Sequence, residues 1–70
     1  MAIKYYKLLD LLNRSGISKE ELRAKIGVSS TTMAKLSKNE PISLDVVNKI
    51  CAVLDCQPGD ILEYDFEDEQ

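Results

Sequence analysis

Three consecutive hydroxyl side chains begin at Ser30, and a lysine follows them at position 35. Residues of these types read base edges in DNA. Threonine offers a hydroxyl to a base and a methyl group to the methyl of thymine, and lysine reaches O6 and N7 of guanine. Thr31 and Lys35 are four residues apart, so they would share one face of a helix. We therefore identify as candidate base-reading residues Ser30, Thr31, Thr32 and Lys35.

The sequence around these residues predicts two short helices with a glycine turn between them. One apolar stripe comprises Leu22 and Ile26, and a second comprises Met33 and Leu36. Apolar side chains at intervals of three and four residues are typical of helices that pack one face on a core. Two such helices joined by a turn form a helix-turn-helix, whose second helix, here about residues 29–38, enters the major groove of DNA.

Serine residues predict where both helices begin. Ser18 is suited to cap the first helix, because Glu21 follows three residues later and completes a capping box. Ser29 is suited to cap the second helix. Free N–H groups at a helix N-terminus bind phosphate oxygens, so Ser29 is also a candidate contact to the DNA backbone.

Three further helices complete an all-helical fold, at about residues 4–14, 43–54 and 58–62. The first two show apolar side chains at helical spacing, and Pro58 suits the first position of the third. We predict a compact bundle of about five short helices. Its core should comprise Leu8, Leu9, Leu12, Leu22, Ile26, Val28, Met33, Leu36, Val47, Ile50, Leu54, Ile61 and Leu62.

The two ends of the chain leave an alternative open. Residues 62–66 alternate apolar and acidic side chains, which is a strand period, and residues 3–5 also alternate. These segments either pair as two short strands or are each irregular. We assign residues 1–66 to one domain and residues 67–70 to an acidic, disordered tail.

Charge is divided unevenly along the chain. Residues 1–38 carry eight lysines and arginines against three acidic residues, a net charge of +5. Residues 39–70 carry one lysine against nine acidic residues, a net charge of −8, so the whole chain has a net charge of −3. Phosphate attraction is a property of the contacting face, and the basic half contains the predicted helix-turn-helix. The overall negative charge is therefore compatible with DNA binding.

The composition argues against an enzyme or a metalloprotein. The chain has no histidine, and neither Cys51 nor Cys56 has a base nearby in the sequence, so no nucleophile–base pair can be assigned. The cysteines match no zinc-binding spacing, and we expect no metal and no cofactor. We expect both thiols to stay reduced in the cytoplasm, because a disulfide would have to fold a helix end back on itself.

Membrane and secreted classes are also disfavoured. No apolar stretch approaches the roughly twenty residues that cross a bilayer, and no basic segment followed by an apolar core indicates a signal peptide. We expect a cytoplasmic protein without a separate domain for a small-molecule ligand.

The order of these features resembles the Cro-like, phage-repressor-like helix-turn-helix family of bacterial regulators, also called the xenobiotic-response-element type. The resemblance covers roughly Leu8 to Leu62. The matching segments are, in order, residues 18–22, residues 26–29, Met33 with Leu36, residues 43–54 and residues 54–62.

This resemblance implies a lambda-repressor-like DNA-binding domain whose third helix enters the major groove. It also implies that Lys19 touches the DNA backbone at the start of the second helix, and that Lys38 and Asn39 do so after the third. The sequence departs from the family at Arg23, where a small residue is usual and where arginine must extend outwards along its aliphatic stem. It departs again where short hydroxyl side chains replace the glutamines that often read adenine.

We predict a small transcriptional regulator that binds specific sequences of double-stranded DNA. The alternative is a protein-interaction module of the same fold, an antirepressor or antitoxin-like partner with a weak DNA face. A homodimer is expected, because one recognition helix covers only a few base pairs. Its candidate surface lies in the acidic C-terminal half, on the outer part of the fourth helix and the stripe of Leu62, Tyr64 and Phe66.

Overall fold

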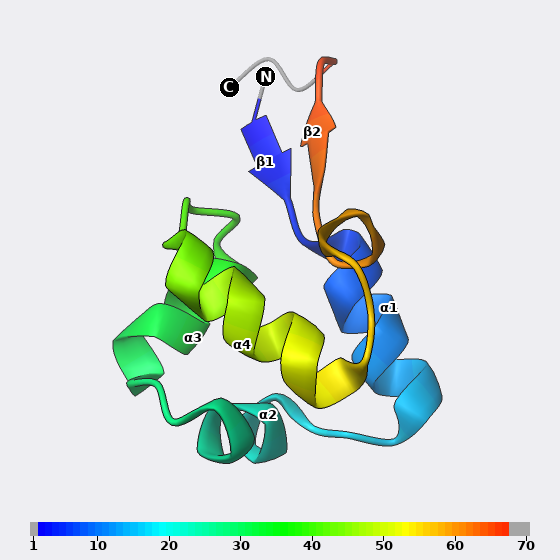
Figure 1. Ribbon diagram of the computed structural model, residues 1–70. Coiled ribbons are helices and arrows are strands. Elements are labelled where there is room, and N and C mark those ends of the chain that lie inside the picture. Colours follow the sequence, from blue (N-terminus) through cyan, green and yellow to red (C-terminus); the bar gives the residue numbers. More distant parts are fainter. Residues whose placement is uncertain (1, 68–70) are drawn as a thin grey trace.

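The computed structural model describes residues 2–67 and shows four helices beneath a small two-stranded ribbon (Figure 1). The predicted helical bundle is confirmed, with a three-residue 3-10 turn in place of the fifth helix. The elements follow the chain as β1 (Ala2–Lys4), α1 (Tyr6–Ser15), α2 (Lys19–Ile26), α3 (Ser30–Ser37), α4 (Leu44–Leu54), η1 (Pro58–Asp60) and β2 (Glu63–Asp65).

Serine caps define the starts of the last three helices. The hydroxyl oxygens of Ser18, Ser29 and Ser43 each accept a hydrogen bond from the backbone N–H three residues later, which satisfies one donor that a helix start leaves free. Glu21 completes the capping box at Ser18. Its pKa is lowered, chiefly because its carboxylate accepts a hydrogen bond from the N–H of Ser18. The predicted helix starts are therefore correct.

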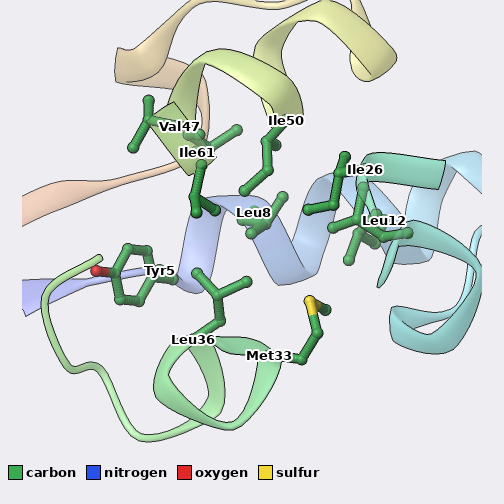
Figure 2. Close-up of a cluster of buried hydrophobic side chains, with 11 residues drawn as sticks. Tyr5, Leu8, Leu12, Ile26, Met33, Leu36, Val47, Ile50 and Ile61 are labelled. Atoms are coloured by element: carbon green, nitrogen blue, oxygen red, sulfur yellow. The ribbon is translucent and has the colours of Figure 1, made fainter. Parts of the chain in front are cut away.

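The core lies where α1, α2, α3 and α4 meet (Figure 2). Four residues of the predicted core, Leu9, Val28, Leu54 and Leu62, are only half-buried. Tyr5 and Val46 are outside the predicted core list and are buried by tertiary packing. The buried apolar residues are Tyr5, Leu8, Leu12, Leu22, Ile26, Met33, Leu36, Val46, Val47, Ile50 and Ile61.

The two ends of the described chain form an antiparallel ribbon. Ala2 pairs with Asp65, Ile3 with Tyr64, and Lys4 with Glu63. The alternative left open by the sequence is thereby resolved in favour of strand pairing. This pairing places Lys4 in β1, so α1 begins two residues later than the sequence predicted.

A buried tyrosine connects this ribbon, through two hydrogen bonds, to the residues that follow α3. Tyr5 lies between β1 and α1 and is 1% exposed. Its N–H donates to Oδ1 of Asn39 at 3.1 Å, and its hydroxyl donates to the carbonyl oxygen of Glu40 at 2.6 Å. Asn39 adopts the left-handed conformation, at φ 59°, which turns the chain back after α3.

Two expectations concern the limits of the domain. Within residues 2–67, no helix is long and apolar enough to cross a membrane. Of the predicted acidic tail, only Glu67 is among the described residues, and residues 68–70 lie outside them.

Candidate nucleic-acid interface

The turn between α2 and α3 has the geometry of a tight helix-turn-helix. Gly27 adopts the left-handed conformation, at φ 69°, and its N–H donates to the carbonyl of Arg23 at 2.9 Å. Glycine suits this position because it has no Cβ. Val28 packs against the core, and Ser29 starts α3 with its hydroxyl oxygen 3.3 Å from the N–H of Thr32.

Helix α3 has a buried face and an exposed face. Met33 and Leu36 point into the core (Figure 2). Thr31, Lys35 and the C-cap residue Lys38 are exposed. They stand at intervals of four and three residues and so line one face of the helix. The exposed face therefore presents a hydroxyl group followed by two ammonium groups.

The predicted hydroxyl residues fall into two pairs. Ser29 and Thr32 face each other, with their hydroxyl oxygens 3.4 Å apart, and Thr32 is half-buried. Ser30 and Thr31 are exposed, and within residues 2–67 neither their N–H groups nor their hydroxyls bond another protein group. Ser30 and Thr31 thus hold the free donors at the start of α3, where an anion is favoured.

The residues predicted to contact phosphate lie at the start of α2 and around both ends of α3. Nζ of Lys19 donates to Oγ of Ser37 at 3.2 Å, which links the start of α2 to the end of α3. Lys38 is exposed. Asn39 is half-buried, and its Oδ1 is occupied by the N–H of Tyr5, so its amide NH₂ is the group left for a phosphate.

The cations of the helix-turn-helix differ from those elsewhere in whether a carboxylate neutralises them. Outside it, Lys7 pairs with Glu63, Arg14 with Asp10, and Lys49 with Asp45. Within residues 2–67, three lysines at the edges of α2 and α3 form no ion pair. These lysines are Lys19, Lys35 and Lys38.

Arg23 is the exception on α2. Its guanidinium pairs with the carboxylate of Glu20, and this hydrogen bond lowers the pKa of Glu20. Nη1 of Arg23 also donates to the carbonyl of Val28 at 3.4 Å. The side chain extends outwards, as predicted, and braces the turn. Arg23 is therefore better placed to hold the turn than to contact DNA.

Residues 7–67 match the family model of the Cro/C1-type HTH DNA-binding domain. The chain belongs to this family. The family is one of DNA-binding domains rather than enzymes, which agrees with the composition.

Two relatives are described as transcriptional regulators. The chain is 39% identical to the uncharacterized HTH-type transcriptional regulator YozG of Bacillus subtilis (strain 168), over 84% of this chain and 73% of that protein. It is 48% identical to the transcriptional regulator VanUg in a crystal structure. That match has a TM-score of 0.86 and covers 89% of this chain and 83% of the other.

The structure brings most of the predicted site together and adds two residues. Lys19 lies beside the end of α3, because its Nζ reaches Oγ of Ser37. The sequence did not predict the contact of Ser37 with Lys19, which depends on how α2 packs against α3, or the bond from Arg23 to the turn at Val28. The only sequence signal was the unusual arginine at position 23.

Proposed function

We propose that this protein is a sequence-specific regulator that binds double-stranded DNA, with α3 in the major groove. The observation that carries the proposal is the exposed face of Thr31, Lys35 and Lys38, which has no internal partner among residues 2–67. Thr31 and Lys35 would contact bases near the middle of this face, and Ser30 would do so at its start. Thr32 would contribute mainly its methyl group, because its hydroxyl faces Ser29.

Phosphate contacts would fix the position of α3 on the duplex. We assign them to Lys19, Lys38, the N-terminal end of α3 at Ser29, and the amide of Asn39. These groups lie at the start of α2 and at both ends of α3. Contacts placed on both sides of a recognition helix set its register, whereas contacts to base edges set its sequence preference.

The salt dependence of DNA binding tests this proposal. Affinity for genomic fragments should fall steeply with salt, because each neutralised phosphate releases counterions. The double variant Lys19→Gln with Lys38→Gln should reduce the slope of log K against log salt by about 2, or about 1 for each lost contact. The double variant Lys7→Gln with Lys49→Gln changes the net charge equally and should leave the slope unchanged. A flat slope for the wild type would instead favour the protein-interaction module.

We also propose that the protein acts as a homodimer through its acidic half. Tyr64 and Phe66 are 45% and 74% exposed, and their rings contact edge-to-face with centroids 4.7 Å apart. Pairing of two β2 strands about Tyr64 would set Glu63 opposite Asp65 of the other copy, which like charges disfavour. We therefore assign the contact to the aromatic side chains rather than to the strand edge.

Sedimentation at micromolar concentration, with and without DNA, tests the dimer. The wild type should sediment as a dimer, and Phe66→Ser should sediment as a monomer with unchanged helical content. A wild-type monomer under both conditions would contradict the dimer and leave the DNA-binding proposal standing.

A further inference from the structure

The chain reverses its direction directly after the C-terminal end of α4. Asp55 adopts the left-handed conformation, at φ 53° and ψ 56°, and its N–H donates to the carbonyl of Cys51. The N–H of Cys56 donates to the same carbonyl at 3.1 Å. The bond from Cys56 spans six residues, as in the Schellman motif, in which the side chains at the positions of Cys51 and Cys56 commonly touch. The fold therefore supplies the reversal that a bond between the two sulfurs requires.

The two thiols share one surface hollow. Both side chains are half-buried, and both line an open pocket of about 360 Å³ together with Leu44, Val47 and Pro58. Burial raises the pKa of the Cys56 thiol, and its neighbour Cys51 raises it further. A small oxidant can therefore reach both sulfurs from solvent.

A metal site does not account for the pair. Among the described residues, 2–67, no cluster of three or more His, Cys, Asp or Glu side chains could hold a metal ion. Two thiols without further ligands do not complete the four-coordinate site that zinc takes in proteins.

We propose that Cys51 and Cys56 are a dithiol site that hydrogen peroxide converts to an intramolecular disulfide. One thiolate attacks the peroxide, an oxygen is transferred to sulfur, and the departing hydroxide recovers the thiol proton and leaves as water. The second thiol then attacks the sulfenic sulfur. The S–S bond forms, the S–O bond breaks and a second water leaves. Two electrons pass from the thiols to the peroxide.

Either cysteine can supply the thiolate that attacks peroxide, and the thiol of the other then closes the bond. Only four residues separate the two cysteines, so closure needs no movement between helices. The site lies at the end of α4 remote from α3 (Figure 1).

Intact mass and thiol counting after peroxide treatment test this proposal on the full chain. Reduced protein should carry two free thiols. Treatment with an equivalent of hydrogen peroxide should remove both, lower the mass by about 2 Da and leave a monomer on a non-reducing gel. Dithiothreitol should restore both thiols. The oxidised protein should unfold at a temperature higher by several degrees, because the bond restrains the unfolded chain.

The single variants Cys51→Ser and Cys56→Ser are matched controls. Each retains one thiol, so Cys56→Ser should give a sulfenic acid that dimedone traps, or a disulfide-linked dimer. Cys51→Ser should behave in the same way through the thiol of Cys56. The proposal is overturned if the wild type keeps both thiols at a dose that oxidises Cys56→Ser. Oxidation of the wild type only to linked dimers or to sulfinic acid would also overturn it.

Discussion

The helix-turn-helix and the acidic half of the molecule differ in how their lysines are used. In the acidic half, Lys49 is paired with Asp45, and Glu63 of β2 neutralises Lys7 of α1. On the helix-turn-helix, Lys35 and Lys38 have no carboxylate partner within residues 2–67. The exposed face of α3 therefore offers positive charge that no carboxylate neutralises. A net charge of −3 conceals this difference.

The two regions also differ in their exposed apolar side chains. No large exposed hydrophobic residue lies between residues 18 and 39, whereas the acidic half exposes Leu44, Val53, Tyr64 and Phe66. A polar, cationic face suits a phosphate-rich partner, and exposed aromatic residues suit a protein surface. The contrast favours DNA at one region and a second protein chain at the other.

The largest expected effect concerns the inner face of α3. Leu36→Ala should lower the free energy of unfolding by about 2–5 kcal/mol, because Leu36 is 1% exposed within the core. Leu44→Ala is the matched control on α4, where the side chain is 83% exposed, and it should change the free energy by less than about 0.5 kcal/mol. Urea denaturation measures both. Equal effects would contradict the assigned core.

The outer face of α3 should control affinity rather than stability. Lys35→Ala should weaken binding to a preferred DNA sequence by about 1–3 kcal/mol if Lys35 contacts a base, and discrimination between bases should fall with it. Lys49→Ala removes the same charge from the acidic half and should leave binding unchanged. Titration of both variants against matched and mutated sites measures the difference. Identical affinities would remove Lys35 from the interface.

Ser29 and Ser30, at the start of α3, should differ in how much each contributes to the free energy of unfolding. Ser29→Ala should lower the free energy of unfolding by about 0.5–2 kcal/mol, because it removes the N-cap of α3. Ser30→Ala should hardly change stability, since its hydroxyl has no partner within residues 2–67. Thermal unfolding of the two variants provides the comparison. A larger loss for Ser30→Ala would reverse the assigned roles.

The smallest effect concerns the junction between the two regions. Tyr5→Phe removes the hydrogen bond to the carbonyl of Glu40 and should cost about 0.5–1.5 kcal/mol. Burial raises the pKa of Tyr5 above its ordinary value of 10.0, so folding favours the neutral phenol. This contribution is complete below pH 10 and is lost as pH rises through the higher pKa of the folded state.

The stability of the wild type and of Tyr5→Phe, measured between pH 9 and 12, tests this assignment. The wild type should lose stability more steeply with pH than Tyr5→Phe does. Parallel curves for the two proteins would show that Tyr5 does not titrate with folding.

Local chemistry made much of the fold predictable. A capping serine needs only the residues that follow it, so Ser18 and Ser29 were assigned correctly from the sequence. The burial of Tyr5 was missing from the predicted core because its partner Asn39 is 34 residues away. Such a contact depends on the tertiary arrangement, and no local period in the sequence reports it.

The candidate site was predictable to a similar degree. Burial of Met33 and Leu36 fixes which residues of α3 face outwards, so the exposure of Thr31 and Lys35 was foreseen. The pairing of Thr32 with Ser29 was not, because a serine or threonine at a helix start serves as either a cap or a contact.

The hydrogen bonds of Tyr5 to the residues after α3 have a thermodynamic consequence for the whole chain. Tyr5 continues directly from β1, which pairs with the strand that carries Tyr64. The two hydrogen bonds of Tyr5 offer one route by which a change in the ribbon would reach the end of α3. Linkage is reciprocal, so whatever free energy dimer formation adds to DNA affinity, DNA must return to dimer formation.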